Sequence, residues 1–424
     1  MTAALYAYAF LDEFVLLYPV YALLFADAGL SVGEISSLFV LWSLTGVLLE
    51  VPSGAWADAV SRRLLLWTGP LLGAAGFALW VLFPSYWAFA AGFVLWGARG
   101  ALGSGALEAL VYEELDLAGA ADRYAAVMGR AHAVGQAAVL AATGLAGPVF
   151  TVGGYPAVGA ASVLACLLCA ATATRFPEHR TPAPADANAD VGGGGGERDE
   201  ARADEGRARA LRTGLSWLCG LRSDRPLLGA LLLVPAVTAV WGALDEYTPL
   251  LVRETGAADG TVPYLLMMIW TGVTAGSLLA GAAERLGRTG LAAVLAGSAL
   301  ALAAGALSGA QPAIALVGLA FGGFQTATVL ADVRLQQRIE GGARATLTSV
   351  AGLGTELVTV AVYGAYGVLG ARFPHGIVFA LCALPYLVTA LAVGRRRRRA
   401  ASALPRGRRR RRARAGPRGR GRGE

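Results

Sequence analysis

One short polar stretch, Gly54-Ala55-Trp56-Ala57-Asp58-Ala59-Val60-Ser61-Arg62-Arg63, places a carboxylate and two guanidinium groups between two long apolar runs. The run before it covers residues 33–55, and the run after it covers residues 64–83. Each has about the 20 residues that a helix needs to cross the ~30 Å hydrocarbon layer of a bilayer. The stretch is therefore typical of a loop between two membrane-spanning helices.

The composition of the whole chain indicates a membrane protein. Its 424 residues are 56% hydrophobic and 15% charged, whereas roughly a quarter of the residues of a soluble protein are charged. Several other segments also have the length of a spanning helix, and they are uninterrupted rather than alternating, which favours helices over a β-barrel. The first apolar run follows no basic residues, so we expect a spanning helix there and not a cleaved signal.

The net charge of +7 comes from one end of the chain. Residues 395–424 hold 15 arginines and one glutamate, while the other 21 arginines face 28 acidic residues, so the rest of the chain carries −7. Because no folded module accompanies this Arg-rich tail, we expect it to lie on anionic lipid headgroups and expect no nucleic-acid partner. The alternative is an extension without function.

Polar segments divide the chain into two sets of six apolar runs. We expect helices at 3–25, 33–55, 64–83, 86–107, 124–149 and 155–175, and again at 227–252, 262–282, 289–307, 312–330, 345–369 and 376–393. Five consecutive glycines and many charged residues between the sets predict a partly disordered cytoplasmic linker. The expected domains are an N-terminal six-helix bundle (1–176), this linker (177–225), a C-terminal six-helix bundle (226–394) and the tail (395–424).

An internal repeat supports this division into halves. Adding 226 to the numbering places Asp58 on Glu284 and Arg62 on Arg288, so the first polar loop has a degenerate copy in the second half. A second similarity, Leu11-Asp12-Glu13-Phe14 with Leu244-Asp245-Glu246-Tyr247, needs a different offset of 233.

The placement of arginines predicts the orientation in the membrane. Only Arg253 and Arg372 fall in the loops of one face, whereas the other loop arginines, the linker and the tail fall on the opposite face. The positive-inside rule then makes both termini cytoplasmic. We expect a multi-pass protein of the plasma membrane.

The polar loop resembles a signature of the major facilitator superfamily, G-x-x-x-D-x-x-G-R-[RK], although Ser61 stands where the family usually has glycine. The matching residues are Gly54, Asp58, Arg62 and Arg63. The resemblance implies an all-α membrane protein with twelve transmembrane helices in two six-helix bundles, a fold that carries solutes by alternating access and is not an enzyme. It also implies that Asp58, held by Arg62, meets the start of the eleventh helix, directly after Arg344, when the cytoplasmic side is shut.

Charged residues inside the apolar runs are candidates for coupling or for the substrate cavity. A charge near the bilayer centre costs at least ~2.5 to 3.5 kcal/mol, so it is retained where it faces a cavity or a partner. Counting ~1.5 Å of rise per residue places five such charges deep in the bilayer: Asp12, Glu13, Glu50, Arg99 and Glu356. Four other acidic residues fall near helix ends, where a solvated position is favoured: Glu108, Asp245, Glu246 and Asp332.

Two further resemblances concern mechanism. The stretch Arg99-Gly100-Ala101-Leu102-Gly103-Ser104-Gly105 is similar to the family's fourth-helix motif, R-x-x-[polar]-G-x-G, which implies proton coupling through Arg99. The alternative is a structural ion pair of Arg99 with Glu50 or Glu108.

Residues 144–154 resemble the G-x-x-x-G-P-x-x-G-G motif of exporters, and the alternative is a helix of small residues that kinks at Pro148. Residues 49–54 and 104–110 also resemble a branch of the superfamily that is often grouped with drug exporters.

No cofactor or metal is expected. The three histidines show no ligand spacing, and Cys166 and Cys169 lie in an apolar run without a second pair of ligands, so packing is favoured over metal or redox chemistry. We therefore expect a proton-coupled exporter of a small organic solute. An importer of a metabolite on the same fold is the second hypothesis, and a non-transporting membrane anchor with a nucleic-acid-binding or scaffolding tail is the third.

Overall fold

The computed structural model describes residues 2–59, 61–103, 105–177, 225–339 and 344–402. Within these ranges, the side chains of residues 50–59, 286, 344–345 and 395–402 lie outside the description. The linker expected at 177–225 and most of the tail expected at 395–424 are therefore not covered.

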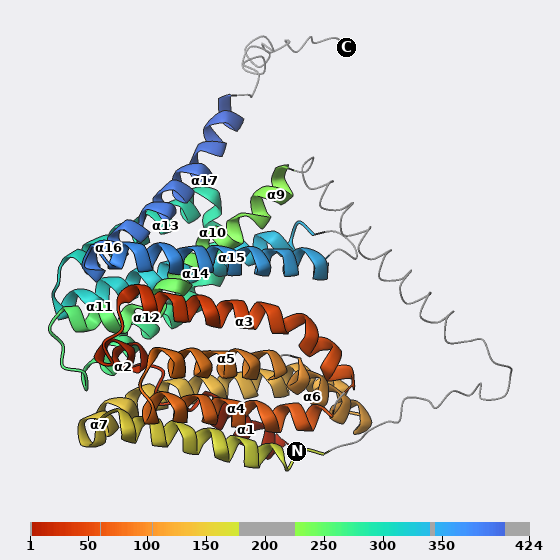
Figure 1. Ribbon diagram of the computed structural model, residues 1–424. Coiled ribbons are helices and arrows are strands. Elements are labelled where there is room, and N and C mark those ends of the chain that lie inside the picture. The colour runs from red at the N-terminus through yellow and green to blue at the C-terminus, as the bar shows by residue number, and fades with distance from the viewer. Residues whose placement is uncertain (1, 60, 104, 178–224, 340–343, 403–424) are drawn as a thin grey trace, which may run out of the picture.

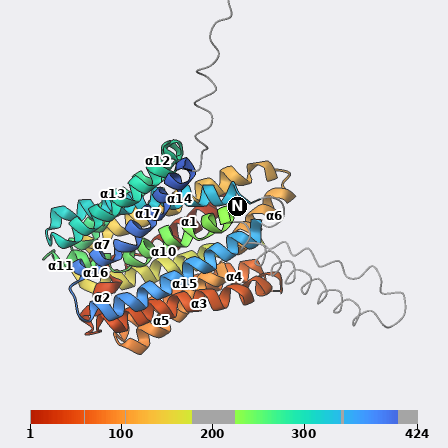
Figure 2. The ribbon, with the colours of Figure 1, turned by 90° about the horizontal axis from the view of Figure 1, so that it is seen from above.

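The described residues form helices and no strands. Two bundles lie against each other, with α3 of the first beside α15 of the second (Figures 1 and 2). The first bundle consists of α1 (Thr2–Glu13), α2 (Tyr21–Asp27), α3 (Val32–Ala59), α4 (Arg62–Leu82), α5 (Tyr86–Gly103), α6 (Ala106–Leu117) and α7 (Tyr124–Ala173). The second consists of α9 (Arg225–Leu231), α10 (Leu233–Asp245), α11 (Thr248–Glu254), α12 (Val262–Ala283), α13 (Gly287–Leu307), α14 (Ile314–Gln336), α15 (Arg344–Gly370), α16 (His375–Cys382) and α17 (Leu384–Ser402).

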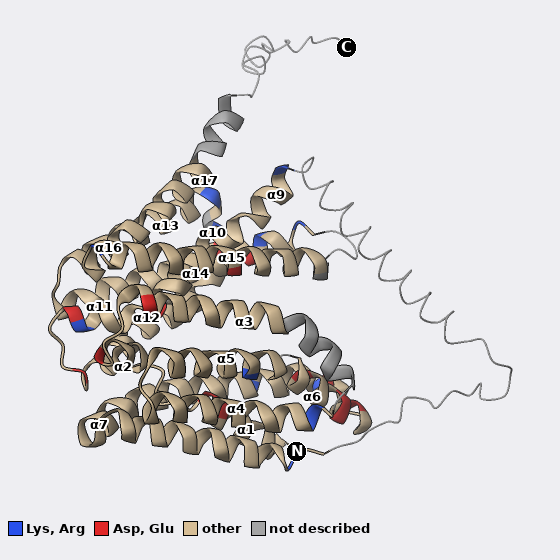
Figure 3. Cartoon of the chain, in the orientation of Figure 1, with Lys and Arg blue, Asp and Glu red and all other residues tan. Residues whose placement is uncertain are grey.

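Nine helical stretches of the described chain are long and apolar enough to cross a membrane. The 50-residue α7 contains both the fifth and the sixth expected helices, which meet at a kink at Gly154. The φ of 59° at this residue lies in the left-handed region that favours glycine. Charged residues are sparse along the helices (Figure 3). The arrangement agrees with the expected twelve transmembrane segments in two six-helix bundles.

The first expected helix, 3–25, is not continuous. The chain leaves helical geometry between α1 and α2, where Pro19 has no N–H to donate to a helix ladder. The backbone N–H of Leu17 instead donates to the hydroxyl of Ser162 on α7, at 3.0 Å. A side chain of another helix therefore replaces one helical hydrogen bond at this break.

The seventh expected helix, 227–252, is broken in a similar way between α10 and α11. Pro249 in the first turn of α11 cannot donate to the carbonyl of Asp245, and the hydroxyl of Thr248 donates to that carbonyl instead, at 2.6 Å. The Leu-Asp-Glu segments of the two halves thus both lie where a helix ends inside its span. This common position agrees with the repeat seen in the sequence.

Close packing of glycines joins α12 and α14 in the second bundle. Gly272 and Gly276 on α12 face Gly318 and Gly322 on α14, so each helix contributes a G-x-x-x-G pair. A Cβ atom added to Gly272 or Gly276 would lie 2.1 or 2.0 Å from a carbonyl oxygen of α14, and one added to Gly322 would lie 2.4 Å from a carbonyl oxygen of α12. Only hydrogen fits at these positions, as at close helix contacts in membranes generally.

Helix order assigns the connections to two faces of the molecule. We call the face with residues 28–31, 255–261 and 371–374 the loop face, and the face where α7 ends and α9 begins the linker face. The bundles contact each other at the loop face. There a Cβ added to Gly367 of α15 would lie 2.9 Å from the Cβ of Ser36 on α3. A Cβ added to Gly147 of α7 would lie 2.7 Å from the carbonyl oxygen of Gly260.

Candidate functional site

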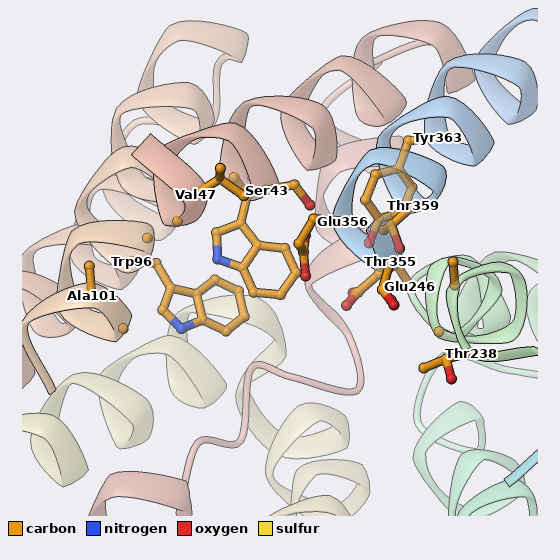
Figure 4. Close-up of a pocket in the computed structure, with 16 residues that line it drawn as sticks. Ser43, Val47, Trp96, Ala101, Thr238, Glu246, Thr355, Glu356, Thr359 and Tyr363 are labelled. Carbon is orange, nitrogen blue, oxygen red and sulfur yellow. The ribbon is translucent and has the colours of Figure 1, made fainter. Parts of the chain in front are cut away.

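A cavity of about 530 Å³ lies between the two bundles, on the linker side of these contacts (Figure 4). Residues of α3 and α5 line it from the first bundle, and residues of α10, α15 and the α10–α11 break line it from the second. Its polar and aromatic lining consists of Trp42, Ser43, Trp96, Thr238, Glu246, Thr355, Glu356, Thr359 and Tyr363. The volume falls within the ~300 to 1,000 Å³ of small-molecule sites.

A second cavity, of about 200 Å³, lies closer to the two helix breaks. It shares Trp42, Trp96 and Glu246 with the larger cavity and adds Asp245 and Tyr18. The indole rings of Trp42 and Trp96 stack with centroids 5.0 Å apart, and the ring of Tyr18 stacks on Trp96 at 5.2 Å. An aromatic stack therefore separates the two spaces.

A buried ion pair lies on the other side of α5. The guanidinium Nη2 of Arg99 donates to Oδ1 of Asp12 at 2.6 Å and to the backbone carbonyl of Asp12 at 2.7 Å. The Arg99 side chain is 9% exposed and the Asp12 side chain 34% exposed. Arg99 therefore pairs with Asp12. The sequence had suggested Glu50 or Glu108 as the partner in a structural ion pair. The side chain of Glu50 lies outside the described residues.

Two local features place Arg99 at this position. Gly73 of α4 leaves room for the guanidinium, because a Cβ there would lie 2.9 Å from Nη1. The pair also lies at the end of α1, where unsatisfied carbonyl groups and the helix dipole favour a positive charge. Cys166 and Cys169 lie near the pair, with Sγ atoms 3.9 Å from Arg99 Nη1 and 3.8 Å from Asp12 Oδ1.

Of the five deep charges expected from the sequence, the four with described side chains do not form one group. Glu356 lines the large cavity, whereas Asp12 and Arg99 pair with each other. Glu13 packs against α7, where a Cβ added to Gly135 would lie 3.3 Å from the Cγ of Glu13. Glu246, expected near a solvated helix end, instead lines both cavities. The sequence estimate took this segment as one unbroken helix, whereas Glu246 lies at the break between α10 and α11, in the Leu-Asp-Glu segment that the repeat marked.

The residues of the polar loop 54–63, those of its copy in the second half and Arg344 are described only in part. The Asp58 and Arg344 side chains lie outside the description, and so do the surroundings of Gly54. Arg62 pairs with Glu113 of α6, with Nη1 and Oε2 2.5 Å apart. On the linker face of the second bundle, Glu284 is exposed, and Arg288 lines a separate cavity of about 270 Å³ together with Arg334 and Arg338. Arg63, the last residue of the polar loop, also has an interaction partner.

Polar contacts between the bundles close the loop face. Arg253, after the second helix break, pairs with Asp27 at the end of α2, and the hydroxyl of Tyr155 donates to the other oxygen of Asp27 at 2.5 Å. Deeper in the molecule, the hydroxyls of Ser36 and Tyr247 share a hydrogen bond of 2.7 Å. The ring of Tyr247 stacks on Tyr366, with centroids 3.6 Å apart.

Two helical bundles around a central cavity define a multi-pass membrane transporter. A family model described as Major Facilitator Superfamily matches residues 2–354, and the chain belongs to this superfamily. No curated protein matches the sequence.

Solved structures of the same fold include several transporters. The nucleoside transporter NupG aligns over 92% of this chain and 98% of its own, with a TM-score of 0.67 and 12% identity. A D-xylose-proton symporter aligns over 92% and 95%, with a TM-score of 0.66 and 14% identity. The POT family transporter PepTSo aligns over 95% and 98%, with a TM-score of 0.65 and 13% identity. At these identities, the likeness shows the fold alone.

Proposed function

We propose that this protein is a secondary active transporter that exports a small organic solute across the plasma membrane in exchange for protons. The observation that carries the proton coupling is the Arg99–Asp12 pair at the end of α1. A carboxylate at this depth faces a cavity or a partner because of its cost in the membrane. Its partner is held on α5, and the opposite side of α5 lines the cavity through Gly97 and Gly100.

Protonation of Asp12 can affect the cavity through one helix, α5, which carries Arg99 and also lines the cavity. A proton on Asp12 removes the counterion of Arg99, and a buried guanidinium without a counterion is destabilising by several kcal/mol. Protonation therefore weakens the contact of α1 with α5. Because α5 also lines the cavity, a change in its position changes the space that the solute occupies. Proton binding and solute binding then favour different conformations, which is the requirement for coupling.

We also propose that the linker face is cytoplasmic, since the loop arginines lie on that side. The closed loop face then corresponds to an inward-facing state, in which the cavity receives solute from the cytoplasm. In the opposite state, Asp58 would meet the start of α15 near Arg344 and shut the linker face, as the family signature implies. The Arg-rich tail would rest on anionic lipids throughout.

Proton-coupled import is the second candidate. It is supported by the fold likeness to a D-xylose-proton symporter. The two directions differ in what expressing cells do: an exporter protects cells from a toxic compound, whereas an importer accumulates a nutrient.

A growth screen tests the proposal. Cells expressing the wild-type chain are challenged with a panel of toxic compounds, with and without a protonophore. We expect resistance to at least one compound, abolished by the protonophore and by Asp12→Asn. Asp116→Asn, an exposed position on α6, is the matched control and should keep full resistance. Resistance that survives both the protonophore and Asp12→Asn would contradict proton coupling through this pair.

A further inference from the structure

The two cavities between the bundles are lined by acidic but not by basic side chains. Their described lining includes Asp245, Glu246 and Glu356, and it includes no arginine or histidine. The chain has no lysine at all. The nearest deep arginine of the first bundle, Arg99, is already paired with Asp12 on the far side of α5. The described side chains that line the solute space therefore include carboxyl groups and no basic group.

Glu246 is the central residue of this arrangement. It lines both cavities from the break between α10 and α11, and no described side chain donates a hydrogen bond to its carboxylate. Figure 4 shows Glu246 on the side of the second bundle, and Trp96 across the cavity on the first bundle. A ligand between the bundles would therefore meet a carboxylate on one side and an indole ring on the other.

The aromatic residues favour a ligand of positive charge. An organic cation is attracted to the face of an indole ring, most strongly where water is excluded. Trp42 and Trp96 line both cavities, and Tyr363 and Glu356 of α15 both line the larger one. Carboxylates and aromatic faces together are the groups that recognise quaternary and protonated amines.

Other ligand classes fit the cavity less well. A bare metal ion would leave most of 530 Å³ unfilled, and no group of three potential ligand side chains occurs among the described residues. A neutral polyol needs hydrogen-bond donors as well as acceptors around it, and the hydroxyls of Thr238 and Thr355 already donate to Thr328 and to the carbonyl of Ala351. The remaining lining is largely apolar, with glycine and alanine residues of α3, α5 and α10.

We propose that the solute is an organic cation with an apolar, drug-sized body, whose charged nitrogen lies between the carboxyl group of Glu246 and the indole rings of Trp42 and Trp96. This inference rests on the proposed transporter function and names its substrate class. An anion of the same shape is excluded by repulsion from the acidic lining, which discriminates by charge and not only by size.

Three soluble naphthalene compounds test the charge preference. 1-Naphthylmethyl-trimethylammonium, 1-naphthylethanol and 1-naphthylacetate share an aromatic body and differ in charge. Binding to the purified full chain in detergent is measured by calorimetry at one pH and ionic strength. We expect the cation to bind at least tenfold more tightly than the alcohol, and the anion not to bind. Equal binding of all three, preference for the alcohol or the anion, or no binding of the cation overturns the proposal.

Variants test the assigned residues. Glu246→Gln keeps the size of the side chain and should weaken cation binding at least tenfold, with little effect on the alcohol. Trp96→Leu should weaken cation binding by about twofold to thirtyfold, the range of cation–π contributions. Glu34→Gln, on the loop face, is the matched control and should bind the cation as the wild type does. Unchanged cation binding by Glu246→Gln overturns the role of this residue.

Transport is measured separately in proteoliposomes that contain the cation. A protein that binds the cation selectively but does not move it across the membrane contradicts the transporter function and leaves the binding site standing. A protein that moves a neutral or anionic solute in a protonophore-sensitive manner supports the transporter function and contradicts the cation proposal. The two ideas can therefore fail independently.

Discussion

Removing the charge of Asp27 should open the loop face. Its carboxylate accepts hydrogen bonds from Arg253 of the opposite bundle and from Tyr155 of its own bundle. Asp27→Asn keeps the shape of the side chain but removes the attraction between the bundles. Within the described part of the chain, the ion pair left to Arg253 is then the one with the more distant Asp259, whose Oδ1 lies 3.6 Å from its Nε. Because the pair exists only while the loop face is closed, its loss favours the state in which that face is open.

The size of the shift follows from the exposure of the pair. The Arg253 and Asp27 side chains are 36% and 30% exposed, and exposed ion pairs contribute about 0.2 to 1 kcal/mol. We therefore expect a change of at most about 1 kcal/mol, which is roughly a fivefold change in the ratio of open to closed molecules. The buried Ser36–Tyr247 hydrogen bond should contribute at least as much, because its loss leaves a buried hydroxyl without a partner.

Distance measurements between spin labels can detect this shift. Labels on cysteines introduced at Ser85 and Ser308, exposed residues on the loop face of the two bundles, report the opening in a background without native cysteines. Asp27→Asn and Arg253→Gln should each increase the long-distance population, and the double variant should add little to either, since both remove the same pair. Identical distance distributions in the wild type and both single variants would refute a role of this pair in closure.

Three further outcomes are expected. Asp12→Asn should lower the free energy of unfolding by about 3 kcal/mol, the lower end for a broken buried ion pair, because Arg99 loses its counterion while Asp12 is partly exposed. The double variant with Arg99→Gln should recover part of the loss. Thermal melting in detergent checks this, and a double variant no more stable than Asp12→Asn would contradict it. Gly276→Ala should prevent accumulation of folded protein. Gly281→Ala on the same helix, with nothing within 4 Å of its Cβ, should instead stabilise the fold by up to about 1 kcal/mol. Size-exclusion profiles compare the two variants, and equal folding would show that α12 and α14 can separate at no cost. Deletion of residues 400–424 should leave transport unchanged and weaken binding to anionic vesicles, and complete loss of transport would assign the tail a further role.

The helices could be predicted from the sequence because bilayer thickness fixes the length of an apolar run. The breaks were missed for the same reason: residues 3–25 and 227–252 remain apolar through Pro19 and Pro249, so the runs read as single helices. A proline in a spanning helix is tolerated when neighbours satisfy the freed carbonyl groups, and this depends on side chains such as Ser162 that lie far away in the sequence.

The candidate site could be predicted only in part. The cost of burying charge identified Asp12, Arg99 and Glu356 as residues that need a cavity or a partner. Depth along a helix does not give rotation about its axis, so the sequence could not show that Arg99 faces Asp12 while Gly97 and Gly100 face the cavity. The sequence favoured a solvated helix end for Glu246, whereas the break before α11 places this residue at both cavities.

The backbone contact between α12 and α14 also has a genetic consequence. Every glycine codon begins with GG, and any single-base change that alters the amino acid adds a side chain or ends the chain. At Gly272, Gly276 and Gly322, where a Cβ would lie 2.0 to 2.4 Å from a carbonyl oxygen of the facing helix, no missense change by one nucleotide yields a residue that fits. In a library of all single-nucleotide variants under selection for transport, these three codons should vary only in their third base.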